Sequence, residues 1–145
     1  MLKKIYPLTK TILSQGQSIS LFFARIAVAY GFYEPAMQKW SDIGSVAQWF
    51  GSIGIPFPTL NAYMAASTEI LGVVLLTLGL FTRLISIPLI VIMIVAISTV
   101  HLSNGFSAGS NGFEIPLYYF LFLSLLLSHG AGKFSLDYLI FARER

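Results

Sequence analysis

The residues that could do chemistry in this sequence are a few ionisable side chains set among long apolar stretches. Glu69 lies deep inside one such stretch, and His101 and Glu114 stand on either side of a polar loop. A histidine beside carboxylates suits proton transfer, because its ring changes charge near neutral pH. The pattern therefore makes Glu69, His101 and Glu114 the candidate catalytic residues.

Arg25 is predicted to form an ion pair with Glu69. On two antiparallel helices rising 1.5 Å per residue, the depths of these two residues differ by only about 5 Å. A charged side chain at the centre of a bilayer costs about 2.5 kcal/mol or more, so each needs a partner. The pair could present an active carboxylate, or it could serve only to fix helix packing.

A second polar group is predicted where the helices end on the outer side. The functional interpretation is a vestibule that handles protons or holds a ligand, and the alternative is a set of residues solvated at the lipid headgroups. For Glu34, which lies about 180° from Arg25 around its helix, the alternative is favoured. The vestibule residues are Glu34, Gln38, Lys39, His101, Asn104, Asn111, Glu114 and Tyr118.

The composition restricts the cofactors. The sequence has no cysteine, which argues against iron–sulfur clusters, zinc ribbons and thiol catalysis. Only His101 and His129 could ligate haem, and the expected topology puts them on opposite faces of the membrane. No spacing matches a known metal motif, so no metal site is predicted. A quinone needs only an apolar slot and one or two hydrogen-bonding groups, so it stays open as a ligand.

The elements that position these residues are predicted to be membrane helices. Of 145 residues, 56% are hydrophobic and only 10% are charged, whereas a soluble domain carries about 25% charged residues. A crossing helix needs about 20 mostly apolar residues. The fold predicted is a single all-α domain over 1–145, a four-transmembrane-helix bundle with approximate spans 19–37, 60–80, 84–102 and 113–128.

The distribution of lysine and arginine predicts that both termini are cytoplasmic, because short inner loops are rich in these residues. The outer side then holds only Lys39, and the inner side holds Lys3, Lys4, Lys10, Arg83, Lys133, Arg143 and Arg145. In the first outer loop, Ile43, Val46, Trp49, Phe50 and Ile53 recur at helical spacing. That spacing predicts a short helix lying in the membrane interface.

Several short motifs, in this order and spacing, resemble the DoxX family of small bacterial membrane proteins. The resemblance covers about 21–137, and its motifs are LFFAR (21–25), AMQK (36–39), EILG (69–72), LGLFTR (78–83), HLSNGF (101–106) and HGAGKFSLD (129–137). The stretches 34–40 and 111–119 resemble a subgroup found with clusters for maturation of metal-binding peptides. The family resemblance implies a four-helix protein of the bacterial inner membrane with a role in redox chemistry, either beside quinone-linked oxidoreductases or as part of an oxidative-stress complex.

The function expected is therefore that of an accessory subunit of a membrane redox or peptide-modification system, holding a quinone or a partner protein against the vestibule. The alternatives are a small-molecule transporter or a stand-alone membrane oxidoreductase that uses Glu69 as a proton-coupled site, and a non-catalytic scaffold. Whether the chain is itself an enzyme stays open. The partners expected are the lipid bilayer and a membrane or periplasmic protein, with no nucleic acid; a homo-oligomer stays open.

Overall fold

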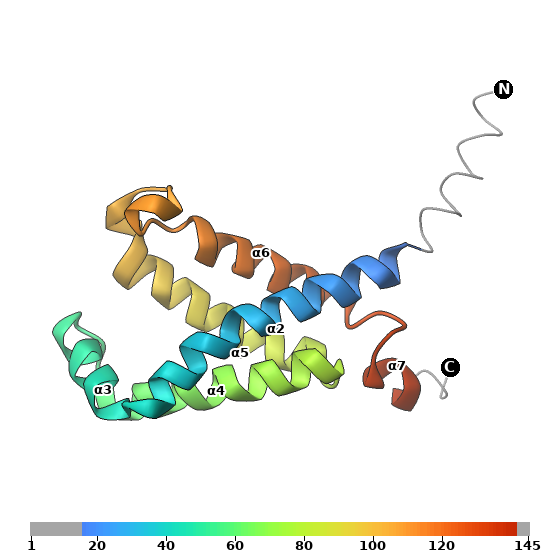
Figure 1. The fold of residues 1–145 in the computed structure, drawn as a ribbon, viewed down its shortest axis with the longest axis horizontal. Helices are drawn as coiled ribbons and strands as arrows, with labels where there is room; N and C mark the ends of the chain where they lie inside the picture. Colours follow the sequence, from blue (N-terminus) through green and yellow to red (C-terminus); the bar gives the residue numbers. More distant parts are fainter. Residues whose placement is uncertain (1–15, 142–145) are drawn as a thin grey trace, which may run out of the picture.

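A computed structural model describes residues 16–141, and within this range all regular structure is helical. The long helices are α2 (Gln17–Ser41), α4 (Pro58–Leu78), α5 (Thr82–Ala96) and α6 (Glu114–His129). Two shorter helices, α3 (Ile43–Ser52) and α7 (Leu136–Phe141), lie at opposite ends of the molecule (Figure 1). The predicted all-α class is confirmed.

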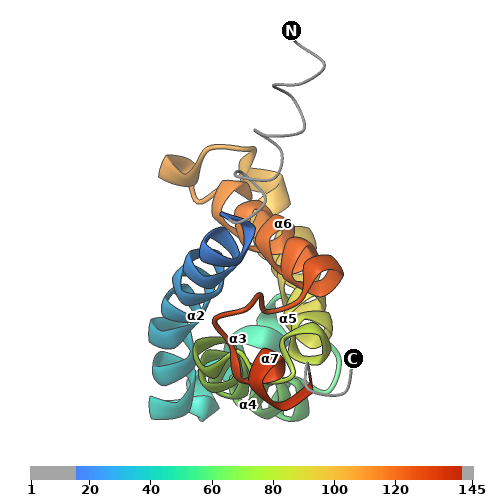
Figure 2. The ribbon, with the colours of Figure 1, turned by 90° about the vertical axis from the view of Figure 1, so that its right-hand side faces the viewer.

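The long helices run antiparallel in chain order and surround a common core when viewed end-on (Figure 2). Side chains from all four helices fill that core, among them Val28, Leu76, Leu89 and Leu123, each fully buried. Small residues let the helices approach closely. Ala62 and Ala66 are fully buried on α4, and a methyl group at Gly72 would press against Leu89 of α5 at 2.8 Å.

Helices α4 and α5 are joined by a tight turn. Gly79 ends α4 in the left-handed conformation at φ +66°, and its N–H donates to the carbonyls of Leu75 and Leu76. Glycine adopts this conformation without the steric penalty of a side chain. The turn therefore fixes the close ends of α4 and α5, and the two helices can separate toward their other ends.

At its far end α5 changes helical type. It continues as a π-helix, η1 (Ile97–His101), and a single 3₁₀ turn, η2 (Leu102–Asn104). The loop that follows contains a second 3₁₀ turn, η3 (Ala108–Ser110), before α6 begins. Insertions of π-helix widen a turn and occur frequently at functional sites. Here the π-helix carries His101.

Helix α3 packs across the first turns of α4. Ala47 and Phe50 of α3 form a small core with Ala62, and Asp42 caps the helix by accepting hydrogen bonds from the N–H of Ser45 at 3.1 Å and its hydroxyl at 2.6 Å. These two hydrogen bonds lower the pKa of Asp42 below its ordinary value. The predicted helix in the first outer loop is thus present; its place in the membrane interface stays a prediction.

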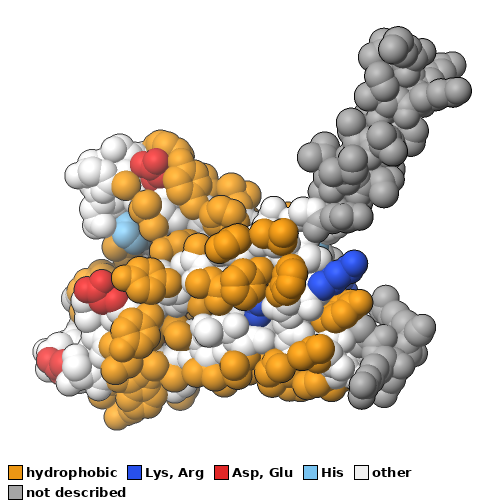
Figure 3. All heavy atoms as spheres, turned by 45° about the vertical axis from the view of Figure 1, so that its right-hand side comes forward, with side chains coloured by type: hydrophobic (Ala, Val, Ile, Leu, Met, Phe, Trp, Pro, Cys, Tyr) orange, Lys and Arg blue, Asp and Glu red, His pale blue; other side chains and the backbone are white. Residues whose placement is uncertain are grey.

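Two helices are long and apolar enough to cross a membrane, namely Pro58–Leu78 and the continuous helix Thr82–Asn104. Helix α6 is apolar but shorter, and α2 is long but charged. The four predicted spans fall on these helices, whereas a four-span topology with cytoplasmic termini stays a prediction. Five of the basic residues used for it, Lys3, Lys4, Lys10, Arg143 and Arg145, lie outside the described residues. In Figure 3, hydrophobic side chains cover most of the visible surface, and the acidic ones lie toward the end with α3.

Candidate functional site

The predicted ion pair between Arg25 and Glu69 is wrong. Glu69 instead accepts a hydrogen bond at Oε2 from Nζ of Lys39, at 2.9 Å. Arg25 extends in the other direction along α4, because the last carbonyl oxygens of a helix lack the usual donor one turn further on and attract a cation. Seven residues separate Glu69 from Leu76, which places the two groups about 11 Å apart along α4.

The guanidinium of Arg25 joins three segments at the end with α7. Its Nη1 donates to the carbonyls of Leu76 at 3.0 Å and Thr77 at 3.3 Å, and its Nη2 donates to the carbonyl of Phe134 at 2.6 Å. Arg25 is 1% exposed. The contacts tie α2 to the end of α4 and to the segment before α7, so its role in this structure is to hold the chain together.

The Lys39–Glu69 ion pair links the last turn of α2 to the middle of α4. The side chain of Glu69 is 3% exposed and that of Lys39 is 20% exposed. It is the one ion pair found among the described residues. Since the ammonium of lysine has three N–H donors, two are left for other partners after the bond to Glu69.

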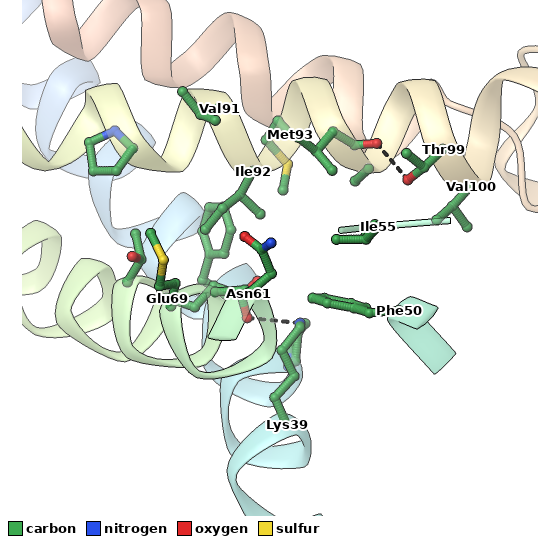
Figure 4. Close-up of a pocket in the computed structure, with 18 of the residues that line it drawn as sticks. Lys39, Phe50, Ile55, Asn61, Glu69, Val91, Ile92, Met93, Thr99 and Val100 are labelled. Atoms are coloured by element: carbon green, nitrogen blue, oxygen red, sulfur yellow. Dashed lines mark hydrogen bonds and ion pairs between the residues drawn. The ribbon is translucent and has the colours of Figure 1, made fainter. Parts of the chain in front are cut away.

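This ion pair borders a cavity of about 560 Å³ between the diverging parts of α4 and α5. Figure 4 shows the Lys39–Glu69 pair on one side, Thr99 and Val100 on another, and Phe50 and Ile55 on a third. Most of the lining is apolar. The polar and ionisable residues that line it are Lys39, Asn61, Thr68, Glu69, Thr99, His101 and Tyr119.

The structure brings together only part of the predicted vestibule. His101 places its Nδ1 2.9 Å from the carbonyl oxygen of Asn111, and the side-chain amide of Asn104 donates to the same oxygen at 3.1 Å. Of the eight residues predicted, Lys39 and His101 line the cavity. The other six lie outside its lining.

His101 and Glu114, both assigned to the predicted vestibule, form no hydrogen bond with each other in the described part of the chain. Glu114 instead accepts from the N–H of Ala108 at 2.9 Å and from the hydroxyl of Tyr118 at 3.1 Å. Glu114 thus braces the loop before α6. Glu34 accepts from Gln38 at 3.1 Å on the exposed face of α2; its solvation at the lipid headgroups stays a prediction.

Sequence reasoning missed Lys39 as the partner of Glu69, and it missed Asn61 and Tyr119 as lining residues. The hydroxyl-bearing ring of Tyr119 stacks on Phe32 with ring centroids 5.7 Å apart, and a methyl group at Gly31 would overlap it. Lys39 lies on the same face of α2 as Arg25, which could have indicated it as a partner for Glu69. It was missed because α2 was expected to end at 37, whereas the helix continues to Ser41.

Comparisons with known proteins identify a family model and several relatives that match this chain. The family model described as DoxX matches residues 20–102. An uncharacterized protein of Haemophilus influenzae is 33% identical over 133 residues, covering 86% of this chain and 85% of that protein. A protein of Bacillus subtilis named "Putative oxidoreductase CatD" is 30% identical over 134 residues, covering 92% and 96%. The inner membrane protein YphA of Escherichia coli is 36% identical over 79 residues, covering 54% of each chain. No solved structure matches.

Proposed function

This chain belongs to the DoxX family of membrane proteins, and we propose that it holds a quinone-class molecule in its cavity as a subunit of a membrane redox system. The relatives named an oxidoreductase and an inner membrane protein support this setting. In the proposed topology four helices cross the bacterial inner membrane and both termini are cytoplasmic. The cavity then lies toward the outer face.

The observation that carries the proposal is an apolar cavity bordered by a buried ion pair. Its volume of about 560 Å³ lies within the range of about 300–1,000 Å³ typical of small-molecule sites, which combine apolar walls with a few polar groups. A quinone has an apolar ring with oxygen atoms on opposite sides and an apolar tail. The free N–H groups of Lys39 suit one of these oxygens, and the apolar walls suit the ring.

The position of the cavity suits a ligand that arrives from the lipid. Several hydrophobic residues that line it from α4 and α5 remain about half exposed, among them Met64 at 56%, Ile87 at 50% and Val91 at 53%, so the cavity is open between these helices. Since α4 and α5 are the two helices most suited to cross a membrane, a ligand dissolved in the bilayer can enter between them. This supports a lipid-soluble ligand.

A partner protein completes the proposal. A quinone supplies two-electron, two-proton redox chemistry when bound, and it needs a source or acceptor of electrons. This sequence has no cysteine to take part in thiol redox chemistry. We therefore propose a membrane or periplasmic protein partner that exchanges electrons with the bound molecule, which makes this chain an accessory subunit.

Binding of decylubiquinone to the purified protein in mild detergent tests the proposal. Trp49 lines the cavity, so a bound quinone should quench its fluorescence in a saturable manner. Trp49→Phe should remove the quenching, whereas Trp40→Phe, which changes the tryptophan outside the cavity lining, should retain it.

A second pair of variants tests where the quinone binds. Val91→Phe fills part of the cavity and should weaken binding about tenfold or more, because overpacking costs about 1–3 kcal/mol. Val74→Phe makes the same change at a 49% exposed position of α4 that does not line the cavity, and should leave binding unchanged. Absence of saturable quenching, or equal effects of both variants, would contradict the proposed function.

A further inference from the structure

We propose that the cavity selects the reduced, hydroxyl-bearing form of its ligand, and that His101 determines this choice by accepting a hydrogen bond from the hydroxyl at Nε2. The inference rests on the proposed function, because it assumes that a quinone-class molecule occupies the cavity. It goes further in assigning the redox form that the site prefers and the atom that recognises it.

The protonation of His101 follows from its neighbour. Nδ1 lies 2.9 Å from the carbonyl oxygen of Asn111, and a carbonyl oxygen can only accept a hydrogen bond. Nδ1 must therefore carry the proton. In the neutral ring the other nitrogen, Nε2, then has a lone pair and acts as an acceptor.

The loop before α6 holds the carbonyl of Asn111 in this place. Asn111 adopts a left-handed conformation at φ +59°, and its carbonyl also accepts a hydrogen bond from Asn104. On either side of it the loop is closed by three backbone bonds, from Gly112 N–H to Ser107 O, from Phe113 N–H to Gly105 O and from Glu114 N–H to Phe106 O. The carbonyl therefore cannot turn away without breaking the loop.

The neighbours of His101 offer acceptors and few donors. The hydroxyl of Thr99, which also lines the cavity, donates to the carbonyl of Val95 at 2.7 Å. The side-chain amide of Asn104 donates to the carbonyls of Val100 and Asn111. A ligand oxygen that meets Nε2 must consequently bring its own hydrogen, which a hydroxyl does and a quinone carbonyl does not.

The other side of the cavity does not discriminate in this way. Lys39 has N–H groups to donate, and the carboxylate of Glu69 can accept, so this pair suits a carbonyl or a hydroxyl equally well. The hydroxyl of Tyr119 can also do either. The difference between the two redox forms thus depends on His101.

The first experiment reads the protonated nitrogen in the ligand-free protein. Nitrogen-15 NMR of the histidine rings at about pH 8.5 distinguishes a proton on Nδ1 from one on Nε2. The signal of His101 is assigned by its loss in His101→Asn and its persistence in His129→Asn. A neutral ring with the proton on Nδ1 is expected, and a proton on Nε2 would overturn the inference.

The second experiment measures the preference with a matched pair of redox-inert probes, a long-chain 4-alkylphenol and its methyl ether. The phenol can donate a hydrogen bond and the ether cannot. The protein is expected to bind the phenol about five- to tenfold more tightly, as one hydrogen bond would provide. In His101→Asn the shorter amide can replace Nδ1 in the bond to Asn111 but offers no atom at Nε2, so the ratio of phenol to ether affinity should fall to about one.

The controls separate failure of this inference from failure of the proposed function. His129→Asn changes the histidine at the opposite end of the bundle and should keep the preference. Equal binding of phenol and ether to the unaltered protein, or a preference retained in His101→Asn, would overturn the inference and leave the cavity as a quinone site. Failure of decylubiquinone and both probes to bind would overturn the proposed function, and the inference with it.

Discussion

At the scale of single residues, the partner of Glu69 decides how the site works. A carboxylate that is 3% exposed needs a cation, and two cations were within reach of the spans expected from the sequence. In the structure Glu69 pairs with Lys39, and Arg25 donates hydrogen bonds to carbonyls at the end of α4. The charge pair therefore lies beside the cavity, and the guanidinium lies at the opposite end of the bundle.

Removing one partner of this pair should destabilise the protein more than removing both. Lys39→Met strands the carboxylate of Glu69 and is expected to cost about 3 kcal/mol. Adding Glu69→Gln should recover much of that loss, because the stranded charge is then gone. Reversible unfolding in mixed detergent micelles gives the free energies.

Arg25→Met is the matched control for that experiment. Its cost should add to that of Glu69→Gln, because the two residues share no contact. The opposite result would contradict the Lys39–Glu69 pair. In that case the double variant Arg25→Met and Glu69→Gln would be more stable than the sum of its single changes predicts, and the costs of Lys39→Met and Glu69→Gln would simply add.

The error in pairing shows what the sequence could and could not determine. The composition and apolar stretches were enough to predict the four long helices, and the helical spacing of apolar residues predicted α3, whereas α7 was not predicted. The partner of Glu69 depended on where α2 ends, and α2 continues to Ser41, one turn beyond the apolar stretch. It depended also on the carbonyls of Leu76 and Thr77, which can accept from Arg25 because α4 ends at Gly79 and no further helical turn covers them. The cavity arises because α4 and α5 diverge, and no short motif in the sequence predicts that two neighbouring helices will separate.

At the scale of elements, Asp137 fastens α7 to the turn between α4 and α5. Its carboxylate accepts hydrogen bonds from the N–H of Phe81 at 2.7 Å and of Thr82 at 3.0 Å, which caps α5. Asp137→Ala should cost about 1–2 kcal/mol and speed amide exchange in α7 and at the start of α5. Leu139→Ala, at a 64% exposed position of α7, should leave exchange at Phe81 and Thr82 unchanged. Equal protection in the two variants would show that the carboxylate does not hold this end.

The cap of α3 should weaken in acid. Because hydrogen bonds from Ser45 lower the pKa of Asp42 in the folded protein, the cap is fully present above the ordinary aspartate pKa of about 4. It is lost as the pH falls through the lowered value. Fluorescence of Trp49, which lies in α3, should therefore change below about pH 4. Asp42→Asn keeps a side-chain oxygen that can accept these hydrogen bonds but does not titrate, so it should lack this change. If the unaltered protein and Asp42→Asn show the same acid transition in fluorescence, the transition belongs to another group.

At the scale of the whole molecule, the topology can be tested without background because the sequence has no cysteine. Single cysteines at Gly109, in the loop before α6, and at Lys133, before α7, should react with an impermeant maleimide from opposite sides of the inner membrane. The excess of positive charge around α7 predicts that Lys133 faces the cytoplasm. Labelling of both from the same side would contradict a four-span topology.

Photolabelling can locate the ligand in the membrane-embedded protein. Irradiating the membrane-embedded protein with an azidoquinone and mapping the labelled peptides reports which residues surround the ring. Labels are expected on residues 49–55, from the end of α3 into the following turn, on α4 within 61–69 and on α5 and η1 within 87–101. Excess unlabelled quinone should remove all of them, and Val91→Phe should reduce them whereas Val74→Phe should not. Labelling spread evenly over the lipid-facing surface, or unaffected by competitor, would contradict the claim that this cavity is a quinone-class site.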